Sequence, residues 1–185
     1  MNINQLSYIY KLSASVDFFE AKSFIKFRKI RLKYKYEILI ILNQIFQRLS
    51  SVFLYTLPLK ASIPFGYYLF YKYSFLKILL LLTFPIAIIE KSLPFGSFLL
   101  FIILFAGLAK NPKVPYFVRF NACQALLIDI ALIIISYIFI ILPFVELGSI
   151  IFIFTLCIFI YSIFQCIYGV EPEIPLISKS VRMQI

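Results

Sequence analysis

Four long apolar runs constrain this chain more than any other feature of its sequence. They cover residues 73–89, 92–109, 120–142 and 150–168. Each is close to the roughly 17–25 residues that a helix needs to cross the hydrocarbon layer of a bilayer. The only charged residues within them are Lys77 and Asp129. Because a helix satisfies its own backbone hydrogen bonds, the runs predict an all-α integral membrane protein with four transmembrane helices.

The composition supports a membrane environment. Hydrophobic residues make up 63% of the 185 residues and charged residues 14%, whereas about a quarter of a soluble domain is charged. A water-soluble fold of this composition would expose large apolar patches. We therefore expect the bilayer to be the solvent of this chain.

Residues 37–53 show a different pattern. Apolar residues recur every three or four positions, and Glu37, Gln44, Arg48 and Ser51 fall on the opposite face. The pattern predicts an amphipathic helix that lies in the membrane interface. A fifth span is the alternative, although its polar side chains would make crossing costly.

The chain accordingly divides into four parts: a basic arm (1–36), an amphipathic or interfacial segment (37–72), a four-helix membrane domain (73–170) and a tail (171–185). An even number of spans puts both termini on one side of the membrane. The positive-inside rule assigns that side to the cytoplasm-like compartment, because most Lys and Arg residues would lie there.

The basic arm carries seven cations without an intervening acid: Lys22, Lys26, Arg28, Lys29, Arg31, Lys33 and Lys35. A cationic run beside membrane spans suits anionic lipid headgroups or a partner protein. Nucleic-acid binding is a second interpretation of such a run, but we expect no nucleic-acid partner. The favoured interpretation is a solvated arm that fixes the topology.

Few residues suit catalysis. The chain has no His, five Gly and three Cys, and the spacing of Cys123, Cys157 and Cys166 fits neither a metal site nor a disulfide framework. We expect packed thiols, no metal, no cofactor and no enzymatic activity.

Polar side chains open the third apolar run. Asn121 and Gln124 are three residues apart and share a helix face, and Asp129 lies roughly on that face about two turns later. One interpretation is hydrogen bonding that holds the helices together. The other is a polar seam that lines a path through the membrane. Arg119, at the end of the helix, is expected to anchor it at the headgroups.

A short motif occurs twice, as "SIPFG" at 62–66 and "SLPFG" at 92–96. Pro-Phe-Gly favours a turn or the start of a helix, because Pro fits a first turn and Gly tolerates tight backbone. One interpretation is two unrelated interfacial turns, and a short duplication is the alternative.

Four stretches resemble one known family: "NPKVPYFVRFNACQALLIDI" (111–130), "EIPLISKSVRMQI" (173–185), "LPLKASIPFG" (57–66) and "SLPFGSFLLF" (92–101). They are similar to blocks of the twenty-kilodalton subunit family of the translocon at the inner chloroplast envelope. The resemblance covers about residues 48–185, and the basic segment before residue 37 has no counterpart. The N-terminal residues lack the pattern of a signal or transit peptide, which suits the plastid-encoded form.

The resemblance implies a four-span protein of the plastid inner envelope with both termini in the stroma. It also implies a subunit of a protein-import complex that contributes to, or flanks, a path for preproteins. Its partners would be other translocon subunits, translocating preproteins and membrane lipids. Asp129 motivates an alternative, a small ion or solute channel or carrier. A non-conducting assembly scaffold is a further alternative.

Overall fold

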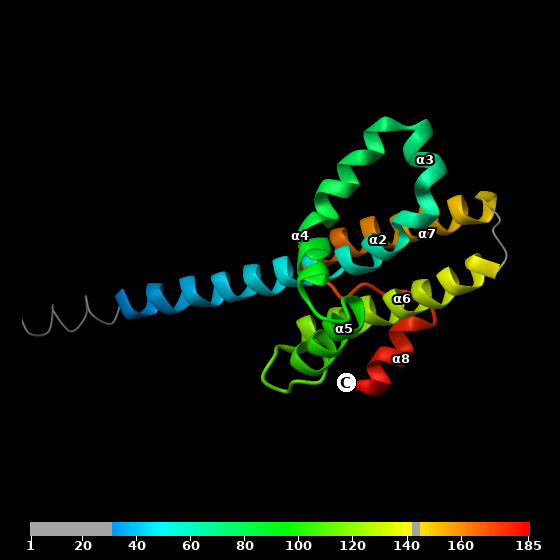
Figure 1. The fold of residues 1–185 in the computed structure, drawn as a ribbon. Coiled ribbons are helices and arrows are strands. Elements are labelled where there is room, and N and C mark those ends of the chain that lie inside the picture. The colour runs from blue at the N-terminus through cyan, green and yellow to red at the C-terminus, as the bar shows by residue number, and fades with distance from the viewer. Residues whose placement is uncertain (1–30, 142–144) are drawn as a thin grey trace, which may run out of the picture. The chain divides into compact units, whose positions relative to one another are not determined.

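The computed structural model describes residues 31–141 and 145–185 (Figure 1). All regular secondary structure in these ranges is helical, which confirms the all-α fold. The chain divides into two compact units, residues 1–45 and 46–185, which we describe separately. Four of the predicted basic contacts, Lys22, Lys26, Arg28 and Lys29, lie outside the described residues.

In the first unit, residues 31–45 are helical. Lys33 and Glu37 form an exposed ion pair of 3.9 Å between neighbouring turns. Arg31 and Lys35 are exposed as well, and so are apolar side chains such as Ile38. Their exposure is compatible with the lipid or partner contact that the sequence suggests, and this contact stays a prediction.

The second unit is built around a short central helix. Residues 46–54 are helical, and α2 (Thr56–Ser62), the 3-10 turn η1 (Ile63–Gly66) and α3 (Tyr67–Lys72) follow. Helix α2 packs against α4 (Ile78–Ser92), α6 (Tyr116–Ile141) and α7 (Val145–Tyr168). Tyr55 and Leu59 are fully buried there. The hydrophobic core thus passes through part of the segment that we predicted to be interfacial.

Residues 48–66 run antiparallel to α7. The Arg48 guanidinium donates a 2.9 Å hydrogen bond to the carbonyl of Ile167, near the end of α7. At the other end, a Cβ added to Gly66 would lie 2.8 Å from the ring of Phe152, and one added to Gly148 would lie 3.2 Å from the Phe65 carbonyl. Residues 148–167 of a helix cover about 30 Å, the thickness of the hydrocarbon layer.

This arrangement differs from a segment that only lies in the interface. Ser51, which we expected on an outward polar face, is fully buried, and Arg48 has a backbone partner. Arg48, one of the polar residues that argued against a crossing segment, therefore has a partner within the protein. Together with the burial of Ser51, Tyr55 and Leu59, this contact favours the alternative of a further span.

The predicted spans 73–89 and 92–109 need correction, because they are not two antiparallel helices. The first part, residues 74–92, comprises η2 (Ser74–Lys77) and α4. The second part, residues 97–109, comprises α5 (Ser97–Leu104) and the π-turn η3 (Phe105–Ala109). The two parts are bent by 102° relative to each other. The second part is only about 20 Å long at 1.5 Å per residue, too short to cross alone. Together the two parts are long and apolar enough for one broken span.

The break falls at the second copy of the Pro-Phe-Gly motif. Phe95 and Gly96 both have positive φ angles, of 62° and 49°, a region that favours glycine. Pro85, a residue that removes a helix hydrogen bond, lies inside α4 before this break. The structure confirms a turn at this motif. In the part of the chain that the structure describes, this is the one helix pair that together is long and apolar enough to cross a membrane and is bent by more than 40°.

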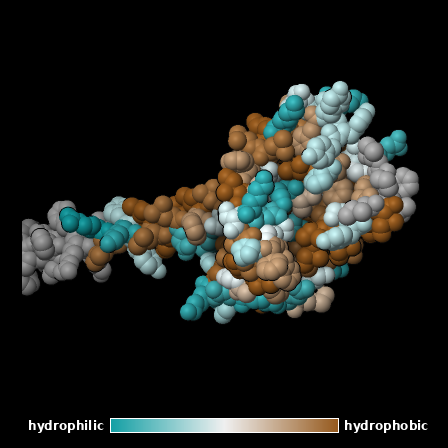
Figure 2. Space-filling view, in the orientation of Figure 1, coloured by the Kyte–Doolittle hydropathy of each residue, from teal (hydrophilic) through white to brown (hydrophobic). Residues whose placement is uncertain are grey.

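The predicted spans 120–142 and 150–168 correspond to α6 and α7, which begin a few residues earlier than expected. In the described ranges three helical stretches are long and apolar enough to cross a membrane: Arg31–Lys72, Tyr116–Phe139 and Glu146–Tyr168. The bent pair 74–92 and 97–109 makes a fourth if its two parts count as one span. Figure 2 shows large hydrophobic areas on the surface, as a membrane protein requires.

Candidate functional site

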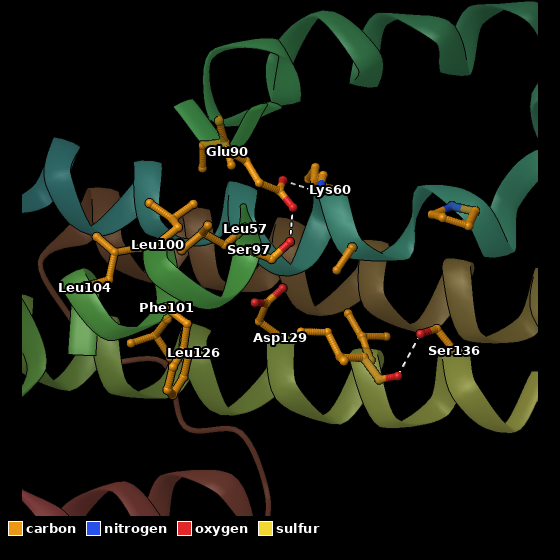
Figure 3. A pocket seen from close by; sticks show the side chains of 15 residues that line it. Leu57, Lys60, Glu90, Ser97, Leu100, Phe101, Leu104, Leu126, Asp129 and Ser136 are labelled. Atoms are coloured by element: carbon orange, nitrogen blue, oxygen red, sulfur yellow. Dashed lines mark hydrogen bonds and ion pairs between the residues drawn. The ribbon is translucent and has the colours of Figure 1, made fainter. Parts of the chain in front are cut away.

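A charged cavity of about 190 Å³ lies where α2, α4, α5 and α6 meet (Figure 3). Three ionisable side chains reach it from three helices: Lys60 from α2, Glu90 from α4 and Asp129 from α6. Most of the remaining wall is apolar and includes Leu100 and Leu126. The cavity therefore combines charge with a hydrophobic surround.

Asp129 sits near the midpoint of α6. The helix runs from Tyr116 to Ile141, so Asp129 lies 129 − 116 = 13 residues from its start and 141 − 129 = 12 from its end. At 1.5 Å per residue, this is nearly 20 Å from either end. If α6 spans the bilayer, the cavity lies at about half its depth.

Lys60 and Glu90 form an ion pair on one wall of the cavity. Ser97, at the start of α5, donates a second hydrogen bond to the Glu90 carboxylate. Glu90 needs such partners, because a carboxylate in the last turn of α4 faces the negative end of the helix dipole. The contacts tie both arms of the broken span to α2.

The Asp129 carboxylate points toward Ser97 and the Lys60–Glu90 pair (Figure 3). It makes no hydrogen bond or ion pair with a residue of the described ranges, although it is half-buried. With all three groups ionised, two carboxylates and one ammonium leave a net charge of −1. Such a charge is costly in a low-dielectric surround unless something compensates it.

Gln124 faces a different neighbourhood, the C-terminal tail. Its side-chain amide is fully buried and donates to the carbonyl of Pro172 at 3.2 Å and to the hydroxyl of Ser178 at 3.3 Å. The Ser178 hydroxyl also accepts a 2.7 Å hydrogen bond from the backbone N–H of Ile174. These bonds fasten the tail and α8 (Ile177–Gln184) to α6.

Asn121 is also fully buried, and both ends of its carboxamide are hydrogen-bonded, whereas the carboxamide oxygen of Gln124 has no partner among the described residues. The Asn121 carboxamide oxygen accepts a 3.0 Å hydrogen bond from the Tyr55 hydroxyl, and its NH₂ group donates to the Phe117 carbonyl at 2.7 Å. The predicted polar strip is thus divided: Asn121 meets the segment before α2, Gln124 meets the tail, and only Asp129 reaches the cavity. The first two contacts match the interpretation of interhelical hydrogen bonding.

Arg119 lies at the same end of α6 as the tail. Its guanidinium donates to the Ala109 carbonyl at 3.3 Å and to the Ile185 carbonyl at 3.2 Å. Lys110 donates to the Gln184 carbonyl at 2.6 Å. The end of the broken span and the tail are therefore joined to the start of α6, and an additional headgroup contact of Arg119 stays a prediction.

Residues 42–181 match the family described as "Chloroplast import apparatus Tic20-like". The chain belongs to the Tic20-like family. The match confirms the resemblance and links the chain to the chloroplast import apparatus. It includes all three residues that charge the cavity and most of the contact between α6 and the tail.

Curated relatives agree with this membership. The chain is 31% identical over 147 residues to "Protein TIC 20-v, chloroplastic" of Arabidopsis thaliana, covering 75% of this chain and 70% of that protein. It is 32% identical over 147 residues to a "Tic20 family protein" of Synechocystis, covering 75% and 92%. A third relative, "Protein TIC 20-II, chloroplastic" of Arabidopsis, is 29% identical over 150 residues, covering 75% and 72%.

Sequence reasoning missed Lys60 and the role of Glu90. Lys60 lies in the "LPLKASIPFG" stretch and Glu90 two residues before the second Pro-Phe-Gly motif. Lys60 is an isolated charge in a largely apolar stretch, and Glu90 with its neighbour Lys91 stands between two apolar runs; charges in such surroundings were the available signal. The meeting of Lys60 and Glu90 depends on the packing of α4 against α2, which no local pattern predicted.

The site offers no recognisable catalytic machinery among the described residues. They contain no group of three or more His, Cys, Asp or Glu side chains that could hold a metal ion. The three cysteines are free thiols, of which Cys123 and Cys166 are buried and Cys157 is exposed. What the cavity provides is a carboxyl group without a direct partner, beside an ion pair, within an apolar bundle.

Proposed function

We propose that this chain is a membrane subunit of the protein-import translocon of the plastid inner envelope, where it contributes to or flanks a path for preproteins. The observation that carries the proposal is the match to the import-apparatus family over residues 42–181. Two relatives are named chloroplastic, which supports the location. Other translocon subunits, preproteins and membrane lipids are the proposed partners.

The proposed topology has four crossings and both termini in the stroma. The crossings are the helical stretch that ends near Lys72, the broken pair 74–109, α6 and α7. The contacts of Ala109 with Arg119 and of Lys110 with Gln184 support one shared end for the broken pair, the start of α6 and the tail. The cations Lys110, Lys113, Lys179 and Arg182 then share the stromal side with the basic arm, as the positive-inside rule requires.

In this proposal the cavity is the part of the bundle nearest to the path. A polypeptide that crosses a bilayer needs polar groups at mid-depth, and Asp129 is the half-buried charge of α6. Cysteines placed singly at 121, 124 and 129 in a cysteine-free background test this geometry. A soluble thiol reagent is expected to modify position 129 during import and to leave the buried positions 121 and 124 unmodified.

A crosslink to an arrested precursor tests the function directly. The chain is tagged, a precursor is arrested during import into isolated plastids, and the crosslinked material recovered by the tag is identified. Recovery of the precursor together with other inner-envelope subunits is the expected result. Recovery of the subunits without the precursor, despite verified arrest, would assign a scaffold role instead.

The unpaired charge of Asp129 favours a second candidate function, a small ion or solute channel or carrier. In that case the purified chain in liposomes would show selective flux, and Asp129→Asn would abolish it. A single unpaired carboxylate is less than the several ionisable groups that transporters usually place at mid-depth. Absence of flux from correctly inserted protein would remove this candidate.

A further inference from the structure

We infer that the cavity beside Asp129 receives one basic side chain, a Lys or an Arg, from the polypeptide that passes the bundle. The inference rests on the proposed function and names the chemistry that this site recognises. It depends on three properties of the cavity: its unbalanced charge, its apolar walls and its depth in the membrane.

The charge of the cavity selects a cation. Lys60 is already paired with Glu90, and Glu90 accepts a further hydrogen bond from Ser97. Asp129 has no such partner among the described residues and faces the open volume. One additional positive charge beside Asp129 would neutralise the group and give its carboxylate a charge-assisted hydrogen bond.

The walls of the cavity select an amphipathic cation. Most of the lining is apolar and includes Leu57, Leu100, Phe101, Leu104 and Leu126. A Lys or Arg side chain buries an aliphatic stem against such a surface and carries its charge at the tip. The Phe101 ring adds an aromatic face, on which a cation is stabilised further.

An inorganic cation fits the cavity less well. Hard divalent cations take about six to eight oxygen ligands, and the lining offers few side-chain oxygens beyond Asp129 and the occupied Glu90. The Ser136 hydroxyl already donates to the Ile133 carbonyl. The volume of about 190 Å³ equals several water molecules at roughly 30 Å³ each, which leaves room for an ammonium or guanidinium group.

The proposed function supplies a polypeptide with this chemistry. Plastid transit peptides are rich in Arg and poor in acidic residues. A basic residue at the middle of a bilayer is costly without a partner, so a fixed carboxylate at half depth would lower that cost. Lys60 and Glu90 are already paired with each other, so Asp129 is the group left to contact the incoming basic side chain.

A site-specific photocrosslink tests the inference in isolated plastids. A photoreactive amino acid replaces Leu104 in the cavity wall, and a second variant carries it at Tyr137, which is 67% exposed on α6. The precursor is arrested with a single Arg in the segment that spans the inner membrane. Matched precursors carry Lys or Gln at that position, and the tag on the chain reports total precursor recovery.

We expect position 104 to crosslink the Arg and Lys precursors. The yield should fall about tenfold for the Gln precursor, because a hydrogen bond to a charged group is lost. Asp129→Asn should have the same effect, and Glu146→Gln, an exposed acid at the start of α7, should have none. The precursor substitutions leave this chain unchanged, so their effect is independent of any folding defect.

Two outcomes would overturn the inference in distinguishable ways. Equal yields at position 104 from Arg and Gln precursors, with the precursor still recovered by the tag, would remove the basic-side-chain site and leave the import function standing. Failure of the tag to recover any arrested precursor would remove the proposed function, and the inference with it.

Discussion

The hydroxyl of Tyr55 donates a 3.0 Å hydrogen bond to the carboxamide of Asn121, and both side chains are fully shielded from solvent. The bond joins residues 66 positions apart and links the start of the central helix to α6. Asn121 is the first polar residue of the third apolar run and lies within the stretch 111–130 that resembles the family. Its contact with Tyr55 indicates that this part of the stretch serves the packing of the bundle.

Replacing Tyr55 by Phe should lower stability, because the buried carboxamide oxygen of Asn121 loses its hydroxyl donor and keeps only the weak 3.4 Å hydrogen bond from the Cys166 thiol. Such a loss costs about 1–3 kcal/mol. The measurement is the midpoint of thermal unfolding of the purified protein in detergent. Tyr137→Phe, at an exposed tyrosine of α6, is the control, and equal effects of the two substitutions would contradict the assignment.

The Lys60–Glu90 pair should show strong coupling. Lys60→Met leaves two carboxylates in the cavity without a cation, and removal of one partner from a buried pair costs about 3–5 kcal/mol. The Lys60 side chain is 33% exposed, so solvent screening should reduce the loss to about 1–3 kcal/mol. The double variant Lys60→Met/Glu90→Gln should be more stable than Lys60→Met alone.

Unfolding midpoints of the two single variants and the double variant give this coupling energy directly. Lys77→Met removes an exposed cation outside the cavity and should change little. If the single and double variants behaved additively, the ion pair would have no energetic role.

Gly66 should not tolerate a larger residue. A Cβ at this position would lie 2.8 Å from the Phe152 ring, so the ring or the helix must shift. Overpacking of this kind costs about 1–3 kcal/mol. At Gly107 a Cβ meets nothing within 4 Å, and Gly107→Ala is the matched control. Equal unfolding midpoints for the two Ala variants would argue against the close approach of η1 and α7.

The tail should loosen when Gln124 loses its amide. Gln124→Leu leaves the Pro172 carbonyl and the Ser178 hydroxyl without this donor, which weakens the contact by about 1.4 kcal/mol or more. Trypsin cleavage at the exposed Lys179 should then be about tenfold faster. Gln165→Leu in α7 is the control, and unchanged cleavage would show that Gln124 does not hold the tail.

The spans that form α6 and α7 were predictable because each is a continuous apolar run of crossing length. The central helix was not, because its local pattern is amphipathic. Local periodicity predicts that Arg48 and Ser51 face outward. In the structure Arg48 binds the Ile167 carbonyl and Ser51 is buried in the core. A tertiary contact between positions 119 residues apart leaves no trace in local periodicity.

The candidate site was predictable only in part. Asp129 was identified as the lone charge of its run, and the Pro-Phe-Gly copy at 92–96 indicated a turn. The sequence did not reveal that this turn bends a span by 102° and brings Ser97 to Glu90, or that α4 packs against α2. Helical spacing placed Asn121, Gln124 and Asp129 on roughly one face, but Asn121 binds Tyr55, Gln124 binds the tail, and Asp129 faces the cavity.

The break at residues 93–96 also bears on how the protein is made. The turn carries backbone groups that lipid cannot satisfy, and Glu90 beside it carries a charge. The helices on either side of the turn are therefore not expected to insert into the bilayer one at a time. Lys60, the partner of Glu90, precedes them in the chain, whereas Arg119 of α6, which binds the Ala109 carbonyl at their end, follows. A nascent chain would have to retain the segment up to Ala109 in a polar or protein-lined environment until α6 has emerged, so membrane insertion is expected to proceed as one concerted late step.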